Sequence, residues 1–174
     1  MPAESPSRPA IPAGPQGLRA PALVLFAAIL ALGAALRLDQ FTLQVLLDDE
    51  WHAVHQILRR GPASIVLELG HADFGIPLAL YDWALVQTVG LSETAMRVPM
   101  MLCGLATIVL FPLAVAPRIG RAEALAFALL LATSPLLVAF SQVARPYAIN
   151  VFLGWVAHWA FLRYWEGSVR AGVV

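Results

Sequence analysis

The sequence predicts an all-α, multi-pass membrane helical bundle of about four spans, with short external helices at the membrane surface. Of the 174 residues, 60% are hydrophobic and only 13% are charged, whereas about 25% of residues are charged in soluble domains. The mean hydropathy is +0.76. Four apolar stretches reach the length of about 17 to 25 residues that a membrane helix needs. They are Pro21–Leu38, Val98–Pro117, Ala124–Phe140 and Tyr147–Trp165.

These spans form one module, residues 21–165, between two tails. Residues 1–20 hold five prolines among Ser, Gly and Ala, a composition typical of a disordered segment. Residues 166–174 form a C-terminal tail. The small residues Gly33-Ala34-Ala35 in the first apolar run suit signal-peptide cleavage. However, the segment before that run is long and poor in charge, which favours an uncleaved anchor.

The segment Ile76–Gly90 decides the topology. It is short and contains Asp82, but its apolar residues follow helical spacing. It either crosses the membrane or lies flat in the interface as an amphipathic helix. If it lies flat and the N-terminus is cytoplasmic, six of the eleven arginines face the cytoplasm; if it crosses, four do. The positive-inside tendency therefore favours four spans, with residues 39–97 external and the Arg118–Arg121 turn cytoplasmic.

Charge and cysteine content exclude two classes of protein. All eleven basic residues are arginine and eleven acids balance them, so the net charge is zero and no basic block suits nucleic acid. Cys103 is the only cysteine and lies in an apolar run, which rules out a disulfide framework within the chain. We therefore expect membrane lipids, and no nucleic acid, as partners.

Three adjacent carboxylates, Asp48-Asp49-Glu50, are the most informative feature of the chain. Such acids repel one another and are costly inside lipid, so they should lie in water just outside the bilayer. The apolar residues from Trp51 to Leu58 are spaced three and four apart, which predicts a short surface helix with the acids in its first turn. A helix cap needs only one acid. Three favour a functional site, in which a carboxylate acts as general base toward a hydroxyl or amine.

The favoured topology also brings arginines to the outer face. Arg97 opens the second long span, and Arg145 precedes Pro146 at the start of the fourth. Their guanidinium groups could hold a phosphate or diphosphate through forked hydrogen bonds. Alternatively each is structural, since Glu93 lies four residues before Arg97 and suits a pair within one helix. Together with the acids, the arginines predict a site for an anionic, lipid-linked substrate.

Histidines in the same external loop raise the question of a metal. His52 and His55 lie three apart, and His71 and Asp73 follow in the loop, so a divalent metal is chemically possible. The pattern recurs by chance and no cysteine supports it, so we assign no metal ligands and no certain cofactor. The segment that begins at His71 contains a glycine and a proline, and it reads equally well as a turn and as a clamp for a lipid headgroup.

Several motifs occur in a telling order along residues 20–165. An initial span is followed by Asp49-Glu50, then by a His-and-Pro segment and a Gly-x-Ser-Glu-x-x-x-Arg stretch. A Ser-Pro ending and an Ala-Arg-Pro-Tyr-Ala start come last. The last four are His71–Pro77, Gly90–Arg97, Ser134-Pro135 and Ala144–Ala148. This order resembles the N-terminal half of the GT-C superfamily of membrane glycosyltransferases, most closely the protein mannosyltransferase and aminoarabinose-transferase group.

The resemblance implies an enzyme that transfers a sugar from a polyprenyl-phosphate donor to an acceptor on the outer face of the plasma (inner) membrane. It implies that the first outer loop supplies the catalytic carboxylate, which falls on Asp49, with Asp48 and Glu50 as neighbours. It places the lipid phosphate at Arg97. Family members have many more spans, so this chain is expected to be a fragment or a truncated product. The missing portion or another membrane subunit would then be a partner.

Two other functions compete with this one. A non-catalytic membrane subunit or a small transporter would suit a short, hydrophobic chain, but a transporter is expected to carry polar groups at mid-bilayer. Here the polar groups gather at one face, where Arg145, His71 and Asp73 would complete a binding site. A metal-dependent membrane hydrolase rests only on the His and Asp residues of the external loop.

Overall fold

The fold is helical throughout the described part of the chain, which comprises residues 20–43, 45–46, 48–67 and 75–167 of a computed structural model. Within α2 the side chains of residues 48, 49, 52, 53, 56 and 60 are outside this description. The helices are α1 (Ala20–Leu38), α2 (Asp48–Arg60), α3 (Pro62–Leu67), α4 (Ile76–Thr88), α5 (Glu93–Ile119), α6 (Arg121–Thr133), α7 (Pro135–Gln142) and α8 (Tyr147–Trp165). The predicted helical class is confirmed.

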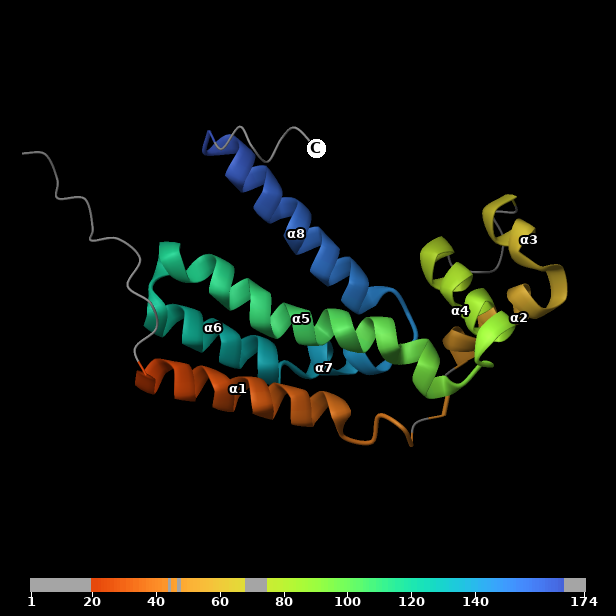
Figure 1. The fold of residues 1–174 in the computed structure, drawn as a ribbon, viewed down its shortest axis with the longest axis horizontal. Coiled ribbons are helices and arrows are strands. Elements are labelled where there is room, and N and C mark those ends of the chain that lie inside the picture. The colour runs from red at the N-terminus through yellow and green to blue at the C-terminus, as the bar shows by residue number, and fades with distance from the viewer. Residues whose placement is uncertain (1–19, 44, 47, 68–74, 168–174) are drawn as a thin grey trace, which may run out of the picture.

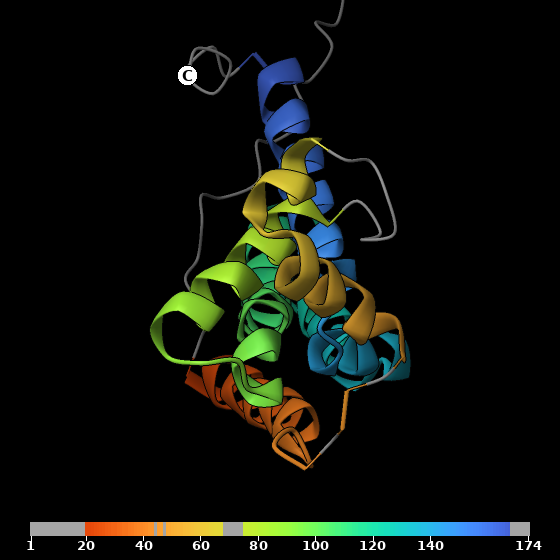
Figure 2. The same cartoon turned by 90° about the vertical axis from the view of Figure 1, so that its right-hand side faces the viewer.

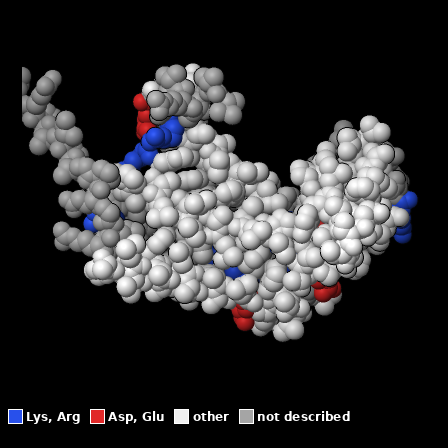
Figure 3. Space-filling view, viewed as in Figure 1, with Lys and Arg blue, Asp and Glu red and all other residues white. Residues whose placement is uncertain are grey.

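The helices form two groups. The helices α1, α5, α6 and α7 run alongside one another as a long bundle, and α8 leaves that bundle at an angle after packing on α5 (Figure 1). The shorter helices α2, α3 and α4 pack together beyond the end of the bundle (Figure 1, Figure 2). Few charged atoms show on the visible face of the molecule, and most of the bundle's flank there is uncharged (Figure 3). This distribution is typical of a protein embedded in lipid.

Two helices, α1 and α5, are long and apolar enough to cross a membrane, and a third span results if α6 and α7 act together. The predicted span Tyr147–Trp165 coincides with α8, which does not meet the same hydropathy test. The described helices therefore give two to three candidate spans, and four are not established. The segment predicted as Ile76–Gly90 forms α4, whose 13 residues pack against α2 and α3 rather than forming a candidate span.

The break between α6 and α7 follows from one proline. Pro135 has no N–H to continue the helix ladder, and the two helices meet at an angle of 53°. The Ser134 side chain accepts a hydrogen bond from Leu137 N at 3.5 Å, so it caps the new helix. The carbonyl groups at the end of α6 lose their partners at this break. The sequence prediction of one span, Ala124–Phe140, missed this interruption.

Arg37 of α1 supplies the missing donors. Its Nη1 donates to Ala132 O at 3.1 Å and to Gly33 O at 3.0 Å, and its Nη2 donates to Leu131 O at 3.0 Å. Its Nε donates to Ser141 Oγ at 3.2 Å. The guanidinium has no exposed surface, and a cation at a helix C-terminus is favoured by the helix dipole. Arg37 therefore holds α1, α6 and α7 together.

A glycine on α5 makes room for this cluster. A Cβ built on Gly104 would lie 2.0 Å from Ser141 Oγ and 3.4 Å from Arg37 Nε, so no larger residue fits there without movement. On the other side of Arg37, Gln142 of α7 donates from Nε2 to three carbonyl groups at the end of α1, those of Leu36, Arg37 and Asp39. Gln142 thus satisfies carbonyl groups at the end of α1, as Arg37 does at the end of α6.

Candidate functional site

The three adjacent acids form the first turn of α2, as predicted. The third of them, Glu50, fixes the position of this turn. Glu50 is 1% exposed, although the two residues before it in the sequence are also carboxylates. One turn later, Val54 is also 1% exposed and packs in the core cluster with Leu46. The first turn of α2 is therefore anchored by a buried acid on one side and by apolar contacts below it.

The partner of Glu50 is Arg97, which lies in the first turns of α5. Arg97 Nη2 donates to Glu50 Oε2 at 3.0 Å, and its Nε donates to Glu50 Oε1 at 3.3 Å. This two-point arrangement is the forked geometry in which arginine binds a carboxylate most strongly. A further bond runs from Arg97 Nη2 to Val45 O at 3.1 Å, and the Arg97 residue is 1% exposed. In this structure the predicted phosphate-binding arginine is thus occupied by a protein carboxylate.

Glu50 also reaches the loop between α7 and α8. Its Oε1 accepts a short hydrogen bond from the backbone N–H of Ala144. The next residue, Arg145, is half-buried, and its guanidinium lies 6.0 Å from the centre of the Tyr147 ring. Segments separated by 94 and 47 residues therefore meet at a single carboxylate. Glu50, Arg97 near the start of α5 and Ala144 in the loop before α8 therefore lie together.

Other predicted residues are placed only in part. Asp48 and Asp49 belong to the first turn of α2, but their side chains are outside the description. His71 and Asp73 lie outside the described residues altogether. The roles assigned to these residues remain predictions. Among the described side chains, no three His, Cys, Asp or Glu residues gather as a metal site would require.

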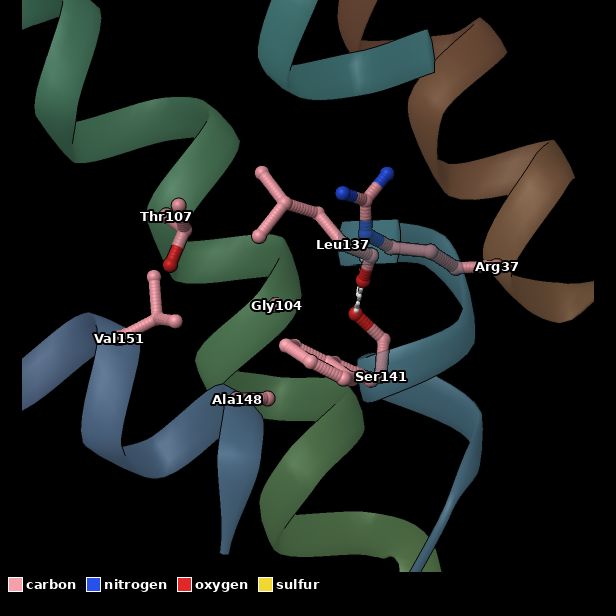
Figure 4. Close-up of a pocket in the computed structure, with 8 residues that line it drawn as sticks. Arg37, Gly104, Thr107, Leu137, Ser141, Ala148 and Val151 are labelled. Carbon is pink, nitrogen blue, oxygen red and sulfur yellow. Dashed lines mark hydrogen bonds between the residues drawn. The ribbon is translucent and has the colours of Figure 1, made fainter. Parts of the chain in front are cut away.

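A small open cleft lies between α5, α7 and α8, with Arg37 of α1 in its lining. Apolar side chains line most of it, while Arg37, Thr107 and Ser141 supply its polar groups (Figure 4). The two hydroxyl groups donate to backbone carbonyls of their own helices, Thr107 to Cys103 O and Ser141 to Leu137 O. The cleft is thus an apolar slot whose polar groups are engaged within the protein. The position of Arg37 in the lining of this cleft was not predicted, because a charged residue near the end of an apolar segment usually marks the end of a helix.

Asp82 of α4 is a second residue to which the sequence alone assigned no functional role. It is 1% exposed, and its Oδ1 has no hydrogen-bond donor among the described residues. Burial raises the pKa of Asp82 from its usual 3.8 to about 7. On the neighbouring residue, Tyr81, burial and then the charge of Asp82 raise the pKa of the phenol, whose OH donates to Ala95 O at 2.8 Å. An acid inside an otherwise apolar helix was the available signal.

Comparison with known proteins adds no assignment, since no protein family, curated protein or solved structure matches this chain. The geometry of the site must carry the functional argument.

Proposed function

We propose that this chain is a membrane glycosyltransferase of the GT-C type, or part of one, that takes a sugar from a polyprenyl-phosphate donor on the outer membrane face. The observation that supports the proposal most is the meeting of three motifs at Glu50: the acidic first turn of α2, Arg97 of α5 and the Ala144–Tyr147 segment. In this proposal α8 is a fourth span, α4 remains outside the membrane, and the site faces the exterior of the plasma membrane.

The proposed reaction needs a base and a phosphate-binding group. Asp49 removes the proton from the acceptor hydroxyl or amine, whose oxygen or nitrogen then bonds to the anomeric carbon of the sugar. The bond from that carbon to the phosphate oxygen breaks, and polyprenyl phosphate leaves. Glu50 acts as a positioning residue, because its carboxylate is buried against Arg97 and Ala144. It fixes the helix turn that carries Asp48 and Asp49.

Arg145 is the proposed phosphate ligand that best suits the geometry. It is half-buried and follows the residue whose N–H binds Glu50, so it lies next to the acidic turn. Arg97 is the less accessible phosphate ligand of the two, since a phosphate could bind it only by competing with Glu50. A non-catalytic membrane subunit or a small transporter is the alternative function. The middle of α1 and of α5 carries no charged residue, which favours the enzyme, because a transporter would need polar groups there. The buried Arg37 lies in the last turn of α1 and is bound by protein groups.

The lipid-binding part is tested with polyprenyl phosphate and the chain reconstituted in nanodiscs. Lysine keeps the charge of arginine but loses the planar fork, so Arg145→Lys and Arg97→Lys should each weaken binding about tenfold. The matched control is Arg59→Lys, an exposed position on α2, which should bind as the parent does. If both Arg145→Lys and Arg97→Lys bind the carrier as tightly as the parent, the proposed phosphate site is wrong.

A further inference from the structure

The buried carboxyl of Asp82 has no role in the proposed reaction and requires its own explanation. Its residue is 1% exposed, and Oδ1 finds no donor among the described residues. Buried polar groups in folded proteins are nearly always hydrogen-bonded, so an exception points to a functional or conformational role. An ionised carboxylate without a partner is too costly to keep in such a place, and the group stays protonated or the surroundings change.

The surroundings of Asp82 are apolar. One turn earlier on α4, Leu78 and Ala79 are 7% and 1% exposed. Leu78 belongs to a core cluster with Val54 of α2, and Ala79 belongs to another with Ile57 of α2 and Ile65 of α3. Asp82 follows these residues at helical spacing, on the same side of α4. It therefore lies on the face by which α4 packs against α2 and α3.

Few described charges are available to compensate Asp82. The helices packed against α4 are α2, α3 and α5; α3 has no titratable residue. On α2, Glu50 is committed to Arg97 of α5, while the other described titratable groups of α2 are exposed: His55 and Arg59. Glu93 in the first turn of α5 is a further acid and offers no compensation. Within α4 itself, the phenol of Tyr81 donates to a backbone carbonyl of α5.

We propose that Asp82 makes the packing of α4 against α2 and α3 sensitive to pH: its neutral form stays buried in the helix interface, and its ionisation favours an opened arrangement. The inference does not depend on the proposed enzymatic function. It concerns the packing of α4, which joins α2 and α3 through two separate core clusters, one of which also includes Met96 and Met100 of α5.

The direction follows from the sign of the pKa change. The pKa of Asp82 is about 7 in the packed state and 3.8 in an exposed one, so the packed state binds more protons between these values. The contribution of the neutral carboxyl to packing is fully present below about pH 4 and is lost as the pH rises through about 7. Between pH 5.5 and 8.5 the opened fraction should rise about thirtyfold.

Cysteine accessibility measures this opening in the full chain in nanodiscs, in a Cys103→Ala background. Ala79→Cys reports on the buried face, and Leu80→Cys, at a position 37% exposed, is the matched control on the same helix. The ratio of their maleimide labelling rates removes the pH dependence of the thiol reaction itself. We expect this ratio to rise about thirtyfold from pH 5.5 to pH 8.5. With Asp82→Asn added, which cannot ionise, the ratio should not change with pH.

Two results overturn the inference. One is a labelling ratio in the Asp82 protein that stays constant between pH 5.5 and pH 8.5. The other is a rise of the same size when Asp82→Asn is present, since the pH response would then come from another group. The first result needs no substitution at Asp82, so it decides the question even if Asp82→Asn alters folding.

Discussion

Replacing Asp49 with asparagine should abolish sugar transfer and leave donor binding largely intact. Loss of a general base typically costs about a hundredfold to ten-thousandfold in rate. Asparagine keeps the shape of the side chain but cannot accept the acceptor's proton, so the chemical step should fail after the substrates bind. The measurement is transfer of a labelled sugar from a polyprenyl-phosphate donor by the reconstituted protein, with donor affinity measured in parallel.

Asp48→Asn is the matched control, because it removes the same charge from the same turn of α2. We expect a milder loss of transfer there, since Asp48 only tunes its neighbour or orients the acceptor. If Asp49→Asn turned over at nearly the parental rate, the base would have to be reassigned to Asp48. If both variants were fully active, the acidic turn would have no catalytic role.

The second large effect is on stability, at the ion pair of Glu50 and Arg97. Both side chains are at most 1% exposed. Glu50→Gln removes one charge and leaves the other buried without compensation, which should cost about 3–5 kcal/mol of unfolding free energy. Arg97→Met should cost a similar amount. The double variant buries no charge, so its loss should be well below the sum of the two single losses. Unfolding in mixed detergent micelles measures the free energy of unfolding of the parent, the two single variants and the double variant.

The chain contains a matched control for this cycle. Arg118 and Glu166 also form an ion pair, but their side chains are 32% and 48% exposed. Exposed pairs contribute about 0–1 kcal/mol, so the same cycle with Arg118→Met and Glu166→Gln should show little coupling. Additive losses at Glu50 and Arg97, as small as those of the exposed pair, would contradict the anchoring role that we give to Glu50.

The helices were predictable because hydropathy and helical spacing are local properties. The bounds of the first and last predicted segments agree with those of helices α1 and α8 within one residue, although α8 is not a candidate span. The interruption of the third was harder to predict, because proline occurs inside α5 as well, at positions 99, 112 and 117, without ending that helix. What distinguishes Pro135 is that Arg37 of a distant helix satisfies the carbonyl groups freed at the break.

Only part of the candidate site could be predicted from local properties. Helical spacing placed the acids in the first turn of α2, and the favoured topology put Glu50, Arg97 and Arg145 on one face. The roles of Asp48, Asp49, His71 and Asp73 stay predictions. Sequence spacing offered Glu93 as one possible partner of Arg97, whereas the structure pairs Arg97 with Glu50, 47 residues away. Such a pairing depends on how the loop and helices pack. The burial of Asp82 likewise depends on three helices meeting.

The central claim is that the acids of α2 and the two arginines form one site on the external membrane face. Impermeant maleimide tests it most directly, in sealed membrane vesicles of known orientation and a Cys103→Ala background. Ala63→Cys on α3 and Ile119→Cys at the end of α5 are exposed reporters on either side of the predicted membrane. We predict that Ala63→Cys is labelled only from the external side and Ile119→Cys only from the cytoplasmic side. Labelling of both from one side, or of Ala63→Cys from the cytoplasm, would contradict the account.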